Sequence, residues 1–252
     1  SINANVATVT NRVENLHRNL PSIIGDVSKT EVGHPLNSYY GYVMEGIYQT
    51  QAEITKHLSG TTNPSSKPGD IRFRDLNGDG IINDKDRDYI GNSIPKLSYG
   101  LNLSAAFKGF DMSILFQGVS GIDIYNDAKQ ITDFDSRPFN HSVLVLDSWK
   151  GEGTSNTIPR ATFNDNGSSK KSSIFVEDAS YFRLKNLEIG YSLNSANAIP
   201  KLGVQNIRIY ASVQNLFTIT DYTGLDPEST DLLDRGTYPQ SQAFLLGINV
   251  KF

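Results

Sequence analysis

The chain has 252 residues, a formal net charge of −4 at pH 7 and no cysteine. This length is sufficient for one large domain or two small ones. The acidic balance argues against nucleic acid as a partner, because nucleic-acid binding usually requires a clustered basic face. The lack of cysteine excludes disulfides and thiolate metal sites but does not fix the compartment.

No stretch approaches the ~18 consecutive apolar residues that indicate a membrane-spanning helix. A strand of a membrane barrel is different, because it crosses in about 9–11 residues and its lumen-facing positions are polar. The first residues, Ser1 to Val6, already resemble a strand, and no leader precedes them. We therefore expect this sequence to begin inside a larger protein.

Two weak strand candidates come first along the chain, at residues 2–10 and 38–48. The second is rich in aromatic residues, but the phase of its alternation is ambiguous. We expect both to be strands of one sheet together with the longer strands that follow in the chain.

The sharpest local motif runs from Asp75 to Asp86 and has the spacing of a twelve-residue calcium loop. Oxygen-bearing side chains stand at positions one, three and five, Gly80 is at position six, and a carboxylate is at position twelve. Calcium prefers six to eight oxygen ligands, so the sequence predicts a structural calcium ion. Asp at position twelve departs from the Glu of helix–loop–helix sensors, and a metal-free turn rich in Asp and Asn is the alternative. The predicted ligands are Asp75, Asn77, Asp79, the carbonyl of Ile81, and Asp86.

The strongest period-two alternation begins at Leu97. Apolar residues occupy the odd positions from Leu97 to Phe107, and after Lys108-Gly109 the even positions from Phe110 to Phe116. This pattern predicts a tight hairpin of two long strands, each with one apolar face.

Three later segments alternate in the same way, at 187–193, 206–214 and 244–252. A soluble sandwich also has alternating strands, but these strands exceed the usual length of ~5–6 residues. Aromatic residues also lie near the ends of the apolar faces, as an interfacial girdle requires. They are Tyr99, Phe107, Phe110, Tyr191 and Phe217.

The connections between the seven candidate strands differ in length. Lys108-Gly109 and 194–203 are short, whereas 49–96, 121–179 and 218–242 are long and rich in Gly, Asn, Asp and Ser. Outer-membrane barrels have short periplasmic turns and long outer loops. If the last strand ends in the periplasm, all three long connections lie on the outer side of the membrane. Only the connection 11–37 is then longer than expected, because it lies on the periplasmic side, where turns are short. Seven strands cannot close a barrel, so we expect the remaining strands to come from a missing N-terminal part.

Enzymatic chemistry finds little support. The four histidines show no ligand-like spacing, and there is no Gly-x-Ser-x-Gly elbow or phosphate loop. The shared polar face of neighbouring strands predicts a wetted lumen rather than a dedicated site; it carries Arg208, Glu188, Asn206, Gln214, Asn249 and Lys251.

Several motifs, in order over residues ~30–252, resemble the SusC/RagA family of TonB-linked outer-membrane proteins. They include Val32-Gly33-His34-Pro35, Pro68-Gly69-Asp70-Ile71 with Asp75-Leu76-Asn77-Gly78-Asp79-Gly80, Phe107-Lys108-Gly109-Phe110-Asp111, Tyr181-Phe182-Arg183-Leu184-Lys185-Asn186, Gln214-Asn215-Leu216-Phe217 and the terminal Gly247-Ile248-Asn249-Val250-Lys251-Phe252.

The resemblance implies an all-β transmembrane antiparallel barrel of about 22 strands with a plug in its lumen, of which this chain would be the C-terminal ~7 strands. It implies import powered through TonB, which contacts a segment near the N-terminus, and a SusD-like surface lipoprotein that captures glycans or peptides. Plug and TonB-contacting segment would lie outside residues 1–252, and no substrate-binding residue can be assigned. A passive porin-like barrel and a secreted calcium-stabilised glycan-binding β domain are the alternatives; an enzyme is not expected.

Overall fold

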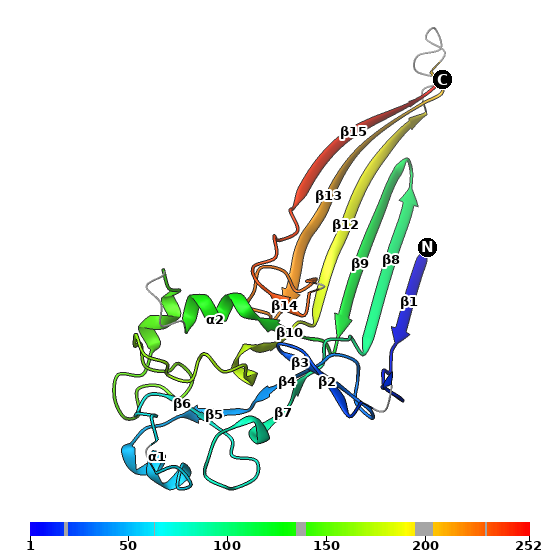
Figure 1. Cartoon of the computed structure of the whole chain (residues 1–252). Helices are drawn as coiled ribbons and strands as arrows, with labels where there is room; N and C mark the ends of the chain where they lie inside the picture. The colour runs from blue at the N-terminus through cyan, green and yellow to red at the C-terminus, as the bar shows by residue number, and fades with distance from the viewer. Residues whose placement is uncertain (18–19, 63, 135–139, 195–203, 230) are drawn as a thin grey trace.

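A long curved sheet dominates the computed structural model, and a layer of shorter elements packs at one of its ends (Figure 1). The structure describes residues 1–17, 20–62, 64–134, 140–194, 204–229 and 231–252. The long sheet has six strands, and all neighbours in it are antiparallel. In spatial order they are β1 (Ile2–Thr8), β8 (Leu97–Phe107), β9 (Phe110–Ser120), β12 (Tyr181–Asn194), β13 (Asn206–Thr220) and β15 (Ala243–Lys251).

The predicted hairpin at 97–117 is confirmed. Phe107 pairs with Phe110, and the two residues between them, Lys108 and Gly109, both have positive φ angles, of 47° and 89°. Two successive positive φ values are the geometry that matches the twist of the flanking strands, and glycine adopts it without strain. The strands predicted at 187–193, 206–214 and 244–252 also form, while the connection 194–203 falls mostly outside the described residues.

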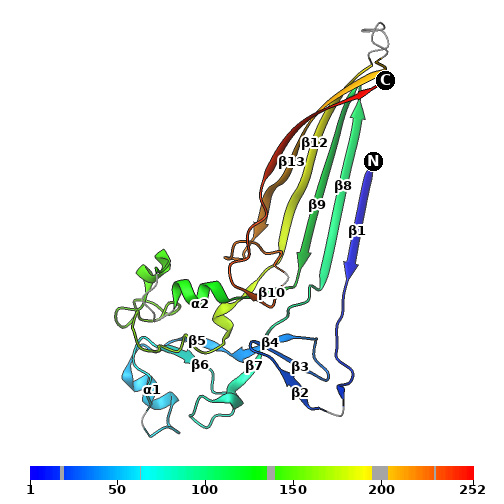
Figure 2. The ribbon, with the colours of Figure 1, turned by 45° about the horizontal axis from the view of Figure 1, so that its top comes forward.

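One strand expected in the long sheet is not there. Residues 38–48 form two short strands of the end layer, so the long sheet has six strands rather than seven. Tyr39 and Tyr42 are buried and Tyr40 is partly buried, so neither face of this strand is solvent-exposed, which explains why the alternation has no clear phase. Because β1 and β8 pair directly, residues 9–96 form one connection, and the length assigned to 11–37 is no longer anomalous. The connections 9–96, 121–180 and 221–242 therefore all leave the sheet at the same end (Figures 1 and 2).

The end layer consists of three small sheets and short helices. Its four-stranded sheet contains β2 (Ser22–Ile24), β3 (Ser28–Glu31), β4 (Ser38–Tyr42) and β7 (Arg87–Gly91); its two-stranded sheet contains β5 (Met44–Ile47) and β6 (Ile71–Phe73); its three-stranded sheet contains β11 (Val176–Asp178), β10 (Asp123–Asn126) and β14 (Leu233–Asp234). The helices are α1 (Gln51–His57), α2 (Asp127–Asp133) and the 3-10 turns η2 (Asp84–Asp86), η3 (Val143–Asp147) and η4 (Ser173–Phe175).

The hydrophobic core lies in this end layer rather than on the long sheet. Val27, Tyr39, Tyr125, Phe134 and Phe175 form its largest buried cluster. Large apolar side chains of β15, in contrast, are solvent-exposed; Leu246, for example, is 87% exposed. Among the described residues no helix is long and apolar enough to span a membrane.

Candidate functional site

The two faces of the long sheet differ in chemistry. Residues directly opposite one another in antiparallel strands share a face, so the register places Leu103, Ile114, Leu187, Val213 and Phe244 in one row. A row on the opposite face contains Ala106, Asp111, Gly190, Tyr210 and Gly247. One face is therefore an apolar strip suited to lipid, and the other is polar and suited to a water-filled lumen.

Aromatic side chains border the apolar strip at both ends, as the sequence predicts. Next to the end layer, the ring of Phe182 lies 6.4 Å from Tyr99, 5.2 Å from Phe116 and 6.4 Å from Phe217 between centroids. At the other end the Phe110 and Tyr191 rings lie 4.5 Å apart. Eight residues of strand separate Tyr99 from Phe107, on the order of 27 Å at the usual rise per residue. This is close to the height of a membrane barrel's apolar band.

A β-bulge in β12 reverses which residues face the lumen. The register of β12 shifts between Leu184 and Asn186 against both of its neighbours: Lys185 is one residue more than β9 has at this point, whereas β13 has one residue more than β12. Such an insertion moves every residue beyond it to the other face. Without the bulge, Arg183 would share the apolar face with Leu187, whereas the observed register places it on the polar face.

Arg183 anchors the connection 221–242 to the long six-stranded sheet, which we call the wall. Its guanidinium donates to the Asp226 carboxylate at 2.8 Å and to Glu228 at 2.6 Å, and its Nε donates to the Thr218 hydroxyl at 2.7 Å. The Arg183 and Asp226 side chains are each only 4% exposed. The Lys185 ammonium also donates to Glu228, at 2.7 Å. Sequence reasoning did not single out this network, although a charged residue that falls out of phase in an alternating strand is a detectable sign of a bulge.

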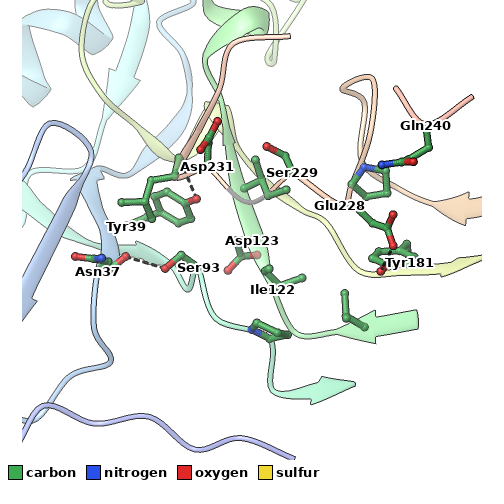
Figure 3. A pocket seen from close by; sticks show the side chains of 15 residues that line it. Asn37, Tyr39, Ser93, Ile122, Asp123, Tyr181, Glu228, Ser229, Asp231 and Gln240 are labelled. Atoms are coloured by element: carbon green, nitrogen blue, oxygen red, sulfur yellow. Dashed lines mark hydrogen bonds between the residues drawn. The ribbon is translucent and has the colours of Figure 1, made fainter. Parts of the chain in front are cut away.

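A cavity of about 610 Å³ opens beside this network, on the polar side of the wall (Figure 3). Val119 and Tyr181 contribute its wall from the strand ends, and Asp123 and Ile122 contribute from the segment that follows β9. The Tyr181 hydroxyl donates to Glu228 at 2.6 Å, so the same acid borders both the cavity and the ion-pair network.

Asp123 is an acid of this cavity whose pKa is raised. Burial raises its pKa, the backbone N–H of Asn92 opposes this by donating to Oδ2 at 2.8 Å, and the negative charge of Asp178 raises it further. Asp178 is the cross-strand partner of Asp123 in the antiparallel pair of β10 and β11. Among the described residues the cavity lining includes no lysine or arginine, and its charged groups are the acids Asp123, Glu228 and Asp231, set among apolar side chains.

Further from the end layer, Arg208 lies on the polar face between two acids. It donates through Nε to Asp111 at 3.0 Å, through Nη2 to the second Asp111 oxygen, and to Glu188 at 2.6 Å. Gly190 lies directly under its guanidinium, and a Cβ there would collide with it. The predicted sharing of one polar face by Arg208 and Glu188 is confirmed. Their ion pair gives each of these partly buried charges an opposite charge as its partner.

The aspartate loop is closed by its own side chains. Asp75 accepts from the backbone N–H of Gly78 at 2.8 Å and of Gly80 at 2.7 Å. Asn77 accepts from Asp79 N–H at 3.0 Å, and Asp79 accepts from Ile81 N–H at 2.8 Å. Burial raises the pKa of Asp75, but the backbone donors Gly80, Gly78 and Asp79 outweigh it and leave the pKa lowered.

Asp86, the predicted ligand at position twelve, is fully buried. Its two oxygens accept from the backbone N–H groups of Leu76 at 3.0 Å and Asn83 at 2.8 Å. The Ile81 carbonyl accepts from the Asn83 amide at 3.1 Å. In the described part of the chain, no three His, Asp or Glu side chains converge as a metal cluster.

Comparison with known proteins identifies relatives, although no family model matches the chain. TonB-dependent receptor P3 of Formosa agariphila is 36% identical over 234 residues, which is 87% of this chain and 22% of that protein. TonB-dependent receptor SusC of Bacteroides thetaiotaomicron is 28% identical over 226 residues, which is 90% of this chain and 20% of that protein. The chain thus spans about a fifth of the length of these relatives.

Solved structures share the fold. The structure of the RagAB peptide transporter superposes with a TM-score of 0.81 at 22% identity, covering 100% of this chain and 27% of that one. The 'closed-closed' state of the RagAB peptide importer gives a TM-score of 0.78 at 24% identity, with the same coverage. The long sheet is therefore one part of the wall of a larger transmembrane barrel, and the chain belongs to the SusC/RagA family of TonB-linked outer-membrane proteins.

Proposed function

We propose that this chain forms the C-terminal part of the wall and outer rim of an active importer that takes up glycans or peptides. The observation that carries the proposal is the two-faced sheet, with an apolar strip between two aromatic rows and a polar face that leads to a cavity at its rim. In the whole protein, a plug and a TonB-contacting segment would precede these residues. The end layer would face outward and meet a SusD-like lipoprotein.

Uptake by the full-length protein tests this proposal. Cells that carry the full-length gene are compared with cells in which the TonB-contacting segment is deleted, using labelled oligosaccharides and oligopeptides. An active importer loses uptake on deletion, whereas uptake that persists after deletion would identify a passive porin. A protein that stays in solution without detergent would instead be the secreted glycan-binding domain.

Calcium binding at the aspartate loop is part of the same proposal. The ligands would be Asp75, Asn77, Asp79, the Ile81 carbonyl and Asp86. An oxygen that accepts one backbone hydrogen bond retains a second lone pair, and Gly78 and Gly80, with φ angles of 70° and 73°, supply the tight turns. A bound ion would neutralise several carboxylates and stiffen a long connection that otherwise has large conformational freedom.

Calorimetric titration of the full-length protein with calcium tests this site. Asp79→Ala is expected to abolish the binding heat, because it removes a central ligand. Asp165→Ala is the control, since Asp165 accepts from the backbone N–H of Gly167 at 3.0 Å in a similar turn outside the loop. No binding to the wild type, or no change in the loop's protease sensitivity after chelation, would contradict a structural calcium ion.

A further inference from the structure

A second cavity lies wholly within the end layer. Its volume is about 590 Å³, and it lies between β6, the 160–170 segment and the aspartate loop, which contributes Ile81 and Ile82 to its wall. Three cationic residues, Lys67, Arg160 and Lys170, also line it.

The acids of this cavity are already engaged. Asp70, whose side chain is 6% exposed, accepts from Arg160 Nε at 2.6 Å and from the backbone N–H of Lys67 at 2.7 Å. Asp165 accepts from the Ser169 hydroxyl at 2.7 Å and from the backbone of Gly167. Asp70 is thus paired with Arg160, whereas Asp165 accepts only from neutral donors and keeps its charge, so the lining holds three cations against two carboxylates, an excess of one positive charge.

Lys170 lies against one aromatic ring rather than beside an acid. Its ammonium lies 4.7 Å from the centre of the Tyr42 ring, and Arg87 lies 5.8 Å from the same ring. Arg87 also lies 5.7 Å from Tyr40, which Lys29 approaches at 4.9 Å. Cations and rings thus alternate across the end layer, with Lys170 as the last cation, beside the cavity. Within the described part of the chain, neither Lys170 nor Lys67 makes an ion pair.

Uncharged polar groups border these cations. Ser65, Ser66 and Asn164 line the cavity, and their side chains form no hydrogen bond to other described residues. Hydroxyl and carboxamide groups both donate and accept, so they match the hydroxyl groups of a sugar.

We propose that this cavity binds an acidic oligosaccharide through its carboxylate or sulfate group. The anion would receive charge-assisted hydrogen bonds from Lys67, Lys170 and the free guanidinium N–H groups of Arg160, whose planar fork suits a carboxylate or a sulfate. The sugar hydroxyls would meet the serine and asparagine side chains. This inference rests on the proposed function, in which the end layer is the outer surface that meets the substrate first.

Calorimetry on the full-length receptor in detergent tests the inference. The probes are a trigalacturonate, a sulfated trisaccharide, neutral maltotriose and triglutamate. We expect at least one acidic sugar to bind about tenfold or more tightly than maltotriose, which corresponds to about 1.4 kcal/mol. The double variant Lys67→Gln/Lys170→Gln should lose that preference while its melting temperature is retained. Lys56→Gln, an exposed residue of α1 outside the cavity, is the matched control.

Three outcomes would overturn the inference: acidic sugars that bind no better than maltotriose, an unchanged preference in the double variant, or tighter binding of triglutamate than of either acidic sugar. TonB-dependent uptake is measured separately on the same strains. If uptake persists while the acidic preference is absent, this inference fails and the importer assignment remains.

Discussion

Arg183 and Asp226 form an ion pair of 2.8 Å between the wall and the connection 221–242, with both side chains only 4% exposed. Removing one partner of a buried pair leaves an unpaired charge, which typically costs about 3–5 kcal/mol. Arg183→Ala should therefore detach this connection and lower the melting temperature of the full-length protein in detergent. A melting temperature equal to that of the wild type would contradict the anchoring role.

Arg235→Ala serves as the control for that experiment. Arg235 also forms an ion pair, with Asp127 at 3.2 Å, but its side chain is 71% exposed. Exposed pairs contribute roughly 0–1 kcal/mol, so this variant should melt close to the wild type.

The connection 221–242 should also loosen in acid. Burial raises the pKa of Asp226, but the backbone N–H of Glu228, the Arg183 guanidinium and the N–H of Gln240 outweigh it, and the pKa is lowered. An aspartate whose pKa is lower in the folded state than its unfolded value of about 3.9 stabilises the folded state. This contribution is complete at pH values above the unfolded pKa and is lost as the pH falls through the folded pKa. Amide exchange in 221–242, corrected for intrinsic rates, should accelerate below about pH 4. Constant protection down to about pH 2 would refute this.

A buried tyrosine offers a test that involves no change of charge. The Tyr222 hydroxyl donates to Asp234 at 2.5 Å, and both residues are buried. Tyr222→Phe leaves the carboxylate short of one donor, and hydrogen bonds to charged groups contribute about 1.5–3 kcal/mol. Chemical denaturation should show that the free energy of unfolding falls by this amount. Tyr238→Phe changes a residue that is 87% exposed and should leave the free energy of unfolding nearly unchanged. Equal stability of the two variants would contradict the prediction.

Gly118 is a position where any side chain should disturb the wall. A Cβ there would meet the backbone carbonyl oxygen of Tyr181 and the ring of Tyr99, and the carbonyl cannot move without distorting β12. Gly118→Ala should reduce folded barrel, seen as loss of the heat-modifiable band on gels, with a cost of about 1–3 kcal/mol. Gly100→Ala is the matched control, because the atoms nearest to its Cβ would belong to the flexible amide of Asn5. If both variants gave wild-type levels of folded protein, the tight contact at Gly118 would not be limiting.

The sequence predicted strands best where apolar and polar residues alternate with one period along a long segment. Alternation from Leu97 to Phe107 located both the strand and its lipid-facing side, since a strand in lipid must keep one face apolar along its whole length. At 38–48 the same reasoning failed, because Tyr39 and Tyr42 are buried in the end layer by tertiary contacts that alternation does not encode.

The candidate site was less predictable than the wall. The spacing from Asp75 to Asp86 identified a tight loop, and the structure forms one, while calcium there stays a prediction. The contacts of Arg183 with Asp226 and Glu228 join residues more than forty positions apart, and local pattern reasoning has no access to such pairings.

The bulge at Lys185 has a consequence for how proteins of this architecture can diversify. It lets the alternating pattern restart, so the short rim segment of β12, 181–184, and the longer membrane segment, 186–194, follow independent phases. Rim residues on the polar face, such as Arg183, can then gain or lose charge without bringing a polar group into contact with lipid. A binding surface could be exchanged there as a module on an unchanged wall, which suggests a junction at this bulge for grafting the rim of one receptor onto another.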